Sequence, residues 1–286
     1  MIERLALIGV GLIGGSLARD LRVLDAVEEV VGYGRSVANL QRAVELGVID
    51  RAAVSARDAV NGADVVLVAV PVGSIAPVLE DISSALGESS IVTDVGSVKQ
   101  SVVEAAQETL GPRFPFFVPG HPIAGTEHSG VEASVEGLFR SRRVLLTPTP
   151  DTDAGALNRV SDMWEAVGAE VIVMDAVEHD EILAASSHLP HMLAFALMDM
   201  LVRMDRHREI FAFSAGGLRD TTRIAGSDPT MWRDIVLANR DALLAVLAQY
   251  RDDVGELIDA IERGDAEWLF EAFSRARAGR ELLSKL

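Results

Sequence analysis

The sequence contains no cysteine among its 286 residues. This absence excludes disulfide bridges, thiolate metal ligands and a cysteine nucleophile. Lysine is also scarce, because Lys99 and Lys285 are the only two among 26 basic residues. A cation that binds an anionic ligand is therefore expected to be an arginine.

Excess positive charge and long apolar runs are missing too. The formal net charge of −17 argues against a nucleic-acid partner, since such proteins carry basic patches. The most apolar later runs, residues 63–72 and 192–202, are shorter than the ~20 residues of a membrane helix. The apolar N-terminal stretch contains Glu3 and four glycines, and we interpret no targeting signal in it. We expect a cytoplasmic protein without a nucleic-acid or membrane partner.

The first part of the chain alternates strand-like and helix-like segments. Hydrophobic residues make up 49% of the chain, which is typical of a globular protein. Strand–helix alternation predicts an α/β fold with a doubly wound, mainly parallel sheet over residues 1–175. The strands are expected at residues 5–10, 29–33, 65–70, 91–95, 116–118, 143–147 and 170–174, and helices at 15–24, 74–86 and 98–110.

From residue 176 to 286 only helical signals remain. A helix is expected over residues 179–204, interrupted or kinked near Pro190. Another begins at the capping sequence Ser227-Asp228-Pro229 and can run to Arg263, where Gly264 stops it. A last helix runs from Ala266 to the end. The 4, 3, 4, 3, 4 spacing of apolar residues along the second helix predicts a surface that packs on another helix: Leu243, Leu247, Tyr250, Val254, Leu257 and Ile261.

A glycine pattern follows the first predicted strand and begins a helix. In Gly9-Val10-Gly11-Leu12-Ile13-Gly14, the first glycine permits a tight turn, the second lets a pyrophosphate approach the backbone, and Gly14 allows close helix–strand packing. The pattern indicates a dinucleotide site, against the alternative of a glycine-rich turn without a ligand. The residues expected to line this site are Gly9, Gly11, Leu12, Ile13, Gly14, Arg35, Ser36, Val70, Pro71 and Ser97.

The end of the second strand bears on the cofactor. A carboxylate about 20 residues beyond the last glycine would hold the ribose 2′-hydroxyl of NAD, but residues 32–36 contain no Asp or Glu. Arg35 and Ser36 suit a 2′-phosphate instead. The sequence favours NADP over NAD, while the alternative that Arg35 is a solvated loop residue remains open.

Histidines gather in two segments that bear polar residues. His121, in the glycine-rich loop Gly120–Glu127, is the best general base, because a neutral imidazole can accept a hydroxyl proton near pH 7. His191 follows Pro190 and is expected to line a pocket, whereas His188 and His179 could equally be hydrogen-bonded core histidines. The spacing matches neither a zinc motif nor a nucleophile elbow, so no metal and no serine-hydrolase chemistry are expected.

One arginine has the setting of a carboxylate clamp. Arg223 lies in a polar segment just before the Asp228-capped helix, and a guanidinium binds a carboxylate through two parallel hydrogen bonds. The alternative is a surface ion pair with Asp220. Lys99, at a helix start, is interpreted as structural.

Together these motifs resemble one family. GxGLIGGSLA, DVGSVK, GHPIAGTE with HSG, SHLPH and DxTRIAxSDPxMW occur in the order and spacing of the prephenate and arogenate dehydrogenases of tyrosine biosynthesis. The resemblance covers nearly the whole chain. It implies a Rossmann-type domain followed by an all-helical dimerisation domain that forms an intertwined homodimer.

The resemblance also implies residue roles. His121 should accept the hydrogen bond of the substrate hydroxyl, and Ser97 should orient that hydroxyl and the nicotinamide. Residues expected to bind or enclose the substrate are Thr126, His188, His191, Arg223 and Trp232, and those expected to support or gate them are Glu127, His179 and Asp220. The implied reaction is oxidative decarboxylation of prephenate or arogenate with hydride transfer to NADP or NAD.

Two other functions share part of this pattern. A β-hydroxyacid-type dehydrogenase would share the two-domain architecture but would lack SHLPH and DxTRIA. A non-catalytic dinucleotide-binding sensor would not need His121 and Ser97, which are both present. The sequence leaves prephenate and arogenate undistinguished.

Overall fold

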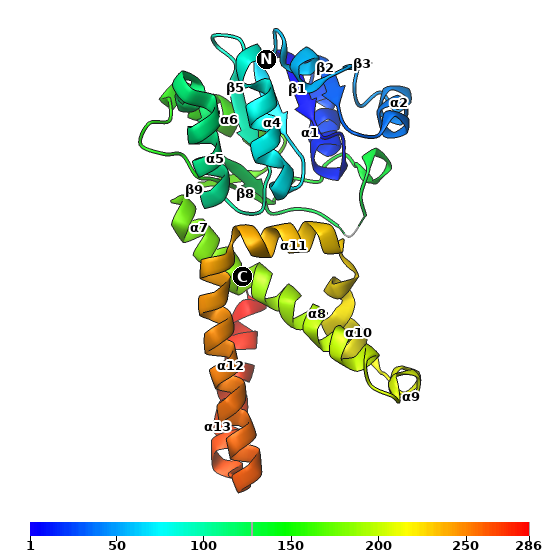
Figure 1. Cartoon of the computed structure of the whole chain (residues 1–286), viewed down its shortest axis with the longest axis vertical. Coiled ribbons are helices and arrows are strands. Elements are labelled where there is room, and N and C mark those ends of the chain that lie inside the picture. The colour runs from blue at the N-terminus through cyan, green and yellow to red at the C-terminus, as the bar shows by residue number, and fades with distance from the viewer. Residues whose placement is uncertain (127, 286) are drawn as a thin grey trace. The chain divides into compact units, whose positions relative to one another are not determined.

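The computed structural model describes residues 1–126 and 128–285, shown as a cartoon in Figure 1. The chain divides into two compact units, Met1–Arg240 and Asp241–Leu286, which we describe separately. The boundary between these units, after Arg240, lies further along the chain than residue 175, where the predicted strands end and only helices are expected. Helices from residue 176 onward pack on the α/β part: α7 (Ala176–Leu183) contacts α5 (Gln100–Leu110), and α11 (Pro229–Ala238) contacts the turn Val72–Ser74.

The first unit contains a six-stranded, wholly parallel sheet in the order β3-β2-β1-β4-β5-β6. This order is typical of dinucleotide-binding folds, and the predicted doubly wound α/β architecture is confirmed. The order reverses between β1 and β4, which opens a crevice at the carboxyl ends of these two strands. The strands are β1 Ile2–Ile8, β2 Val27–Tyr33, β3 Arg51–Ala52, β4 Val65–Val68, β5 Ile91–Asp94 and β6 Phe117–Val118.

Helices cover both faces of this sheet, as Figure 1 shows. Successive residues of a strand point to opposite faces: Leu5 and Leu7 of β1 join one buried core, and Ala6 and Ile8 join the other. The first core includes side chains of α1, α2 and α6, and the second those of α3, α4 and α5. These helices are α1 Leu12–Val23, α2 Val37–Glu45, α3 Ala56–Val60, α4 Ile75–Ile82, α5 Gln100–Leu110 and α6 Ala154–Ala166.

A second, three-stranded sheet follows. It comprises β7 Gly120–Pro122, β8 Arg143–Leu146 and β9 Glu170–Val173, with β7 antiparallel to β8. The expectation that His121 lies in an irregular loop is wrong, because His121 is the middle residue of β7 and pairs with Leu145. Neither β7 nor the two-residue β3 was predicted, since such short strands show no alternating pattern.

The predicted helix over residues 179–204 is interrupted, as expected, near Pro190. It consists of α7 Ala176–Leu183, a π-helical turn Ala184–His188, and α8 Leu189–Val202. Pro190 lies in the first turn of α8, where its missing N–H costs least. The unit continues with α9 His207–Ala212, α10 Gly216–Thr222, the 3₁₀ turn Arg223–Gly226 and α11 Pro229–Ala238.

The helix expected to run from residue 229 to 263 is broken at Asn239. This residue is the C-cap of α11, with φ −107° and ψ 39°, and it is buried. Its side-chain amide donates to the carbonyl of Asp180 at 2.8 Å. This tertiary hydrogen bond holds Asn239 outside helical geometry, so α12 begins anew at Arg240.

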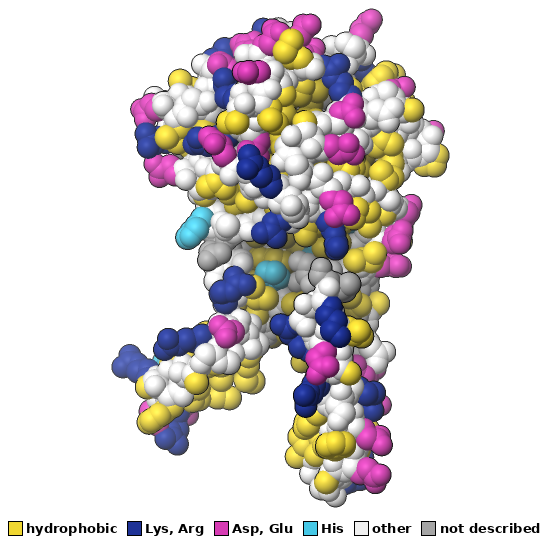
Figure 2. All heavy atoms as spheres, turned by 180° about the vertical axis from the view of Figure 1, so that it is seen from behind, with side chains coloured by type: hydrophobic (Ala, Val, Ile, Leu, Met, Phe, Trp, Pro, Cys, Tyr) yellow, Lys and Arg dark blue, Asp and Glu magenta, His cyan; other side chains and the backbone are white. Residues whose placement is uncertain are grey.

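The second unit is a helical hairpin of α12 Arg240–Arg263 and α13 Ala266–Leu283 (Figure 1). Gly264, with φ +64°, forms the turn, and the Asp265 carboxylate caps α13 by accepting from Trp268 N. Figure 2 shows hydrophobic side chains gathered on the surface of this hairpin. Large hydrophobic residues exposed there are Leu244, Tyr250, Ile258, Ile261, Phe270, Phe273, Leu282 and Leu283.

Within residues 1–126 and 128–285, no helix is both long enough and apolar enough to cross a membrane.

Candidate active site

One pocket of about 540 Å³ lies at the reversal point of the parallel sheet and extends to α8 and α11. It is formed by the loop after β1, the segment after β4, the turn after β5, strand β7 with the loop that follows it, and the helices around Arg223. Eleven residues predicted for the cofactor or substrate line it: Gly11, Leu12, Ile13, Val70, Pro71, Ser97, His121, Thr126, His191, Arg223 and Trp232. All of them belong to the first compact unit.

The glycine loop has the geometry that a dinucleotide requires. Gly9 has φ +100°, and a Cβ there would lie 2.3 Å from the carbonyl oxygen of Ala69. A Cβ on Gly14 would lie 2.4 Å from Leu7 Cδ1, which explains the close packing of α1 on β1. A Cβ on Gly11 would meet no protein atom within 4 Å, so this backbone faces open space.

The N-terminus of α1 faces the same space. Its N-cap is Gly11, and no side chain caps the helix. Uncapped N–H groups at a helix N-terminus are a site for a phosphate, because they are donors at the positive end of the helix dipole. These residues therefore fit the pyrophosphate of a dinucleotide.

Arg35 and Ser36 follow the end of β2 and do not line this pocket. Both are exposed, and the Ser36 hydroxyl accepts a hydrogen bond from Asn39 N at 3.2 Å as the N-cap of α2. The segment between β2 and α2 contains no carboxylate. The charged side chain of this segment is therefore that of Arg35, which is positive.

No motif pointed to Asn39, which links the glycine loop to a distant segment. Its amide nitrogen donates to the carbonyl of Val10 at 2.7 Å, and its amide oxygen accepts from Val131 N at 3.0 Å. Asn39 thus fixes the glycine loop from outside the pocket. Only the tertiary structure brings these three residues together.

His121 is held by a buried ion pair beneath β7. Lys99 is fully buried, and its ammonium donates to Asp94 Oδ2 and, at 2.6 Å, to the carbonyl of Gly120. Asp94 Oδ1 in turn accepts from Gly120 N at 3.1 Å. Burial lowers the pKa of Lys99, and the neighbouring Asp94 carboxylate acts in the opposite direction. The pair fixes the residue that precedes His121, in agreement with the structural role expected for Lys99.

The imidazole of His121 begins a chain of three side chains. Its Nδ1 lies 2.9 Å from His179 Nε2, and His179 Nδ1 lies 2.7 Å from Asp180 Oδ1. Asp180 Oδ1 also accepts from Lys99 N at 2.8 Å, and Oδ2 accepts from Gln100 N at 2.9 Å, at the start of α5. His179 and Asp180 are buried and do not line the pocket.

The environment of His121 favours the neutral imidazole. Burial lowers the pKa of His121 well below 6.5, and the nearby His179, Lys99 and His188 lower it further. A neutral histidine has one nitrogen that can accept a proton. His121 is therefore unprotonated and able to act as a base near pH 7.

A second histidine of the pocket, His191, stacks on Trp232, and we call this pair of rings the aromatic wall. The rings of His191 and Trp232 are stacked, and His191 Nδ1 lies 2.9 Å from the carbonyl of Ser187, to which it donates. Burial lowers the pKa of His191, the hydrogen bond to Ser187 opposes this, and Arg223 lowers it further. The Nε2 atom of His191 is consequently an acceptor at the pocket, beside a guanidinium.

His188 lies behind this wall and not on it. It is buried, and its Nδ1 lies 3.0 Å from the amide nitrogen of Asn239, which donates to it. Its ring meets that of Trp232 edge to face at 6.0 Å between centroids. Among the described residues, neither His188 Nε2 nor Trp232 Nε1 has a hydrogen-bond partner, although both atoms are buried.

Two predicted supporting residues are not part of this arrangement. Asp220 is exposed on α10. Asp220 and Arg223, which are both among the described residues, form no ion pair with each other. Glu127 lies outside the described residues. In the part of the chain that the structure describes, no group of three or more His, Asp or Glu side chains is placed to hold a metal ion.

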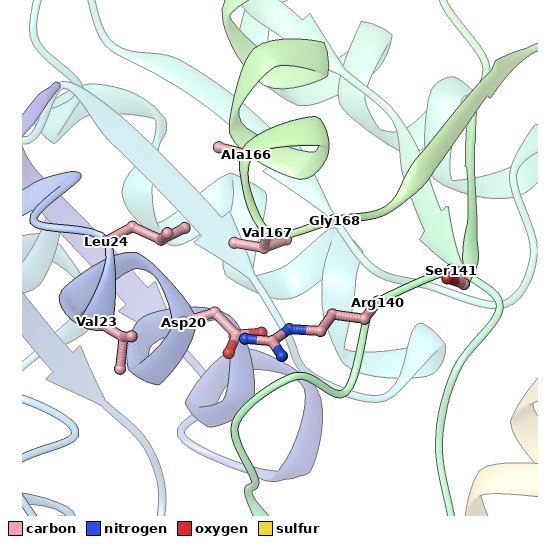
Figure 3. Close-up of a pocket in the computed structure, with 8 residues that line it drawn as sticks. All are labelled: Asp20, Val23, Leu24, Arg140, Ser141, Ala166, Val167 and Gly168. Carbon is pink, nitrogen blue, oxygen red and sulfur yellow. The ribbon is translucent and has the colours of Figure 1, made fainter.

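A second hollow, of about 330 Å³, lies at the opposite end of α1 (Figure 3). Asp20 and Arg140 point toward one another across it. Asp20 Oδ1 accepts from Gly137 N at 2.7 Å, while Oδ2 is buried without a partner among the described residues. Burial raises the pKa of Asp20. None of the predicted site residues lines this hollow. The hydrogen bond between Gly137 and Asp20 fastens the segment around Gly137 to α1.

Comparison with known proteins assigns both parts of the chain. A family model described as the nucleotide-binding domain of prephenate dehydrogenase matches residues 17–173. A second, described as the dimerization domain of prephenate dehydrogenase, matches residues 175–275. The chain is 38% identical over 282 residues to cyclohexadienyl dehydrogenase of Zymomonas mobilis, covering 98% of this chain and 96% of that protein.

Solved structures agree. The crystal structure of prephenate dehydrogenase from Aquifex aeolicus in complex with hydroxyphenyl propionate and NAD⁺ has a TM-score of 0.92 and 37% identity, covering 99% of each chain. Synechocystis arogenate dehydrogenase has a TM-score of 0.81 and 30% identity, covering 97% of this chain and 99% of that one.

Proposed function

The chain belongs to the prephenate dehydrogenase family, and we propose that it oxidises and decarboxylates prephenate or arogenate in a pocket built around His121. It is a dehydrogenase that uses a nicotinamide dinucleotide. The observation that carries the proposal is the lining of a single pocket by the glycine loop, His121 and Arg223. A base and an anion clamp thus face the cofactor site together.

The substrate class explains what the pocket must supply. Prephenate and arogenate are cyclohexadienes with a hydroxyl on C4 and a carboxylate on C1. Loss of the hydroxyl proton, of hydride from C4 and of carbon dioxide from C1 gives an aromatic ring, which drives the reaction forward. The nicotinamide, when bound, accepts the hydride. The chain itself then has to position the substrate, remove one proton and hold the carboxylates.

We assign these tasks to the residues that line the pocket. His121 accepts the hydroxyl proton, and Ser97 orients the hydroxyl from the turn after β5. Arg223, the arginine of this pocket, binds a carboxylate. His191 offers an acceptor to the polar groups of the substrate, and Thr126 a hydroxyl. Trp232 and the buried His188 form and support the aromatic wall.

For the cofactor we propose NADP in preference to NAD. Gly11, Leu12 and Ile13 would hold the pyrophosphate at the start of α1. The positive charge of Arg35 and the absence of a carboxylate after β2 support recognition of a 2′-phosphate. The relative from Aquifex aeolicus, by contrast, is described with NAD⁺, so both cofactors enter the test below.

We further propose a dinucleotide-binding domain over residues 1–175, a helical domain over residues 176–286, and a homodimer formed through the helical domain. The hydrophobic side chains exposed on α12 and α13 support an interface there, because monomeric proteins rarely expose large apolar patches. Light scattering coupled to size-exclusion chromatography should give twice the 30.6 kDa mass of the chain.

Steady-state rates for prephenate and for arogenate, each with NAD and with NADP, test the proposal. We expect turnover of one or both substrates and a higher kcat/KM with NADP. The variant His121→Ala should lose at least about 10²-fold in kcat, because general-base catalysis contributes factors of 10² to 10⁴, while it still binds NADP. No turnover of either substrate with either cofactor would overturn the function.

A further inference from the structure

We infer that Asp180, acting through His179, fixes His121 in the tautomer whose Nε2 is bare and stabilises the positive charge that His121 acquires from the substrate. His179 and Asp180 are thus positioning residues. This inference rests on the proposed function, because it takes His121 to be the base. It adds to that function an explanation of how His121 can accept a proton although it is buried.

The direction of the hydrogen bonds follows from the acceptor at the end of the chain. Both oxygens of Asp180 face backbone N–H groups, those of Lys99 and Gln100, so the carboxylate acts as an acceptor. His179 must then donate from Nδ1 to Asp180 Oδ1, across 2.7 Å. A neutral imidazole carries one proton, so His179 Nε2 is left as an acceptor.

The same reasoning fixes the next ring. Because His179 Nε2 is an acceptor, His121 must donate to it from Nδ1, across 2.9 Å. The remaining nitrogen of His121, Nε2, therefore has no proton. Of the two ring nitrogens it is the one not used in the chain, and His121 lines the pocket. The base that meets the substrate is therefore His121 Nε2.

A buried base beside a buried cation has a weak affinity for protons. The groups that act on His121 are His179 on α7, Lys99 before α5 and His188 in the π-helical turn. Two carboxylates stand behind them: Asp180 contacts His179, and Asp94 contacts Lys99. Burial and the positive charge of Lys99 both oppose an imidazolium at this position. Asp180 is the carboxylate that the hydrogen-bonded chain connects to His121.

The proton balance is simple. The substrate hydroxyl proton binds His121 Nε2 as the O–H electron pair becomes part of the new carbonyl. The proton on His121 Nδ1 moves to His179 Nε2 in the same hydrogen bond. His121 is then neutral again, and the positive charge lies on His179, next to the Asp180 carboxylate. The hydride leaves C4 for the bound nicotinamide. As carbon dioxide leaves C1, the electron pair of that bond enters the ring and turns the carbonyl into a phenolate oxygen, which takes the proton back along the same hydrogen bonds.

The tautomer can be measured on the unchanged protein. With ¹⁵N-labelled histidine in the full chain at pH 7.5, the ring-nitrogen shifts distinguish a protonated from a bare nitrogen, and His121→Ala identifies the signals of His121. We expect a protonated Nδ1 and a bare Nε2. The opposite tautomer would overturn the inference, whether or not any variant of the chain folds.

Variants test the role of the carboxylate. Asp180→Asn should lower kcat about 10²-fold and leave the KM for NADP within about twofold. It should also move the acid limb of the pH profile of kcat/KM to lower pH, because loss of the carboxylate makes protonation of the His121–His179 pair less favourable. A fall in kcat without this shift would mean that Asp180 merely caps α5, and would overturn the inference.

His179 offers a rescue test. His179→Leu removes the acceptor for His121 Nδ1, whereas Gln at this position can return an oxygen to the place of His179 Nε2. We expect His179→Gln to exceed His179→Leu about tenfold in kcat. Equal rates for the two variants would count against the hydrogen bond.

Asp20→Asn is the matched control. Asp20 is another buried aspartate that accepts a backbone N–H, but it lies at the far end of α1 (Figure 3), and its variant should keep the wild-type kcat and pH profile. A wild-type kcat in His121→Ala would defeat the proposed base and with it this inference. Wild-type behaviour of Asp180→Asn beside an inactive His121→Ala would defeat this inference alone.

Discussion

The imidazole of His191 and the indole of Trp232 lie face to face, with ring centroids 3.7 Å apart and planes 20° from parallel. The two residues come from α8 and α11, about 40 positions apart in the chain. The hydrogen bond from His191 Nδ1 to the carbonyl of Ser187 fixes the ring from the other side. The stack and this hydrogen bond together fix the orientation of the His191 ring at the pocket.

Replacing Trp232 should separate the effect of the stack from that of the surrounding core. Trp232 packs with Val98 and Ile235 in a small hydrophobic cluster. We expect Trp232→Ala to lower the free energy of unfolding by about 3–5 kcal/mol and to raise the KM for the substrate. Trp232→Phe keeps a ring against His191, so both its loss of unfolding free energy and its rise in KM should be much smaller. Urea unfolding and steady-state kinetics measure the two effects. Equal losses in both variants would contradict a role for the stack.

Two changes after β2 should alter cofactor preference in the same direction. Arg35→Ala should raise the KM for NADP roughly 10- to 100-fold and leave the KM for NAD unchanged, since a hydrogen bond to a charged group contributes about 1.5–3 kcal/mol. Gly34→Asp should improve the use of NAD, because it supplies a carboxylate for the ribose and a Cβ there has no neighbour closer than 3.9 Å.

The measurement is kcat/KM for each cofactor in the two variants and the wild type. An Arg35→Ala enzyme with undiminished affinity for NADP would show that Arg35 is a solvated loop residue, and a strong wild-type preference for NAD would refute the proposed NADP specificity.

Two glycines of the same loop should fail for different reasons. In Gly14→Ala the new Cβ would lie 2.4 Å from Leu7 Cδ1 and 2.9 Å from Gly9 O, so overpacking should cost about 1–3 kcal/mol of stability. In Gly11→Ala the Cβ meets no protein atom within 4 Å, and stability should be nearly unchanged.

Gly11→Ala should nevertheless weaken cofactor binding roughly tenfold or more, because its methyl group occupies the space where the pyrophosphate approaches the backbone. Thermal unfolding without cofactor and cofactor titration by fluorescence separate the two effects. A Gly11→Ala protein that binds the dinucleotide as the wild type does would place the pyrophosphate elsewhere.

Buried histidines should make the fold sensitive to acid. Burial lowers the pKa of His188 to about 4, whereas an unfolded histidine has a pKa of about 6.5. Between these values the unfolded chain binds a proton that the folded chain does not. The free energy of unfolding should therefore fall by about 3 kcal/mol for this residue as the pH drops from about 6.5 to about 4.

The variant His188→Asn keeps a polar side chain toward Asn239 but cannot titrate. Urea unfolding of both proteins at pH 7, 6, 5 and 4.5 should show a shallower loss of stability in the variant. Parallel curves over this window would mean that His188 does not control the acid sensitivity.

The parts of the fold that follow local rules could be predicted. Continuous apolar runs gave β4 and β5, the glycine pattern gave the turn between β1 and α1, and Pro190 marked the interruption before α8. Strand β7 escaped prediction because its three residues owe their conformation to β8. Asn239 ends α11 because of a hydrogen bond to Asp180, and no local pattern records that contact.

Polar residues of the pocket could be chosen from their motifs, and the structure gathers most of them around one cavity. The contacts of the residues that hold them in place could not be predicted. Asn39 acts through Val10 and Val131, and His179 was expected among the supporting residues without its contact to His121. Such links join positions 29 to 92 residues apart, and their spacing carries no periodic signal.

The sequence alone determined the α/β architecture and the dinucleotide turn and led to His121 as the proposed base, because each depends on residue type and short-range spacing. The tertiary structure decided the contacts of His121 with His179 and of His179 with Asp180, from which we infer the tautomer of His121. Those properties depend on distances between atoms of separate elements, which exist only once α7 packs against the carboxyl ends of the sheet.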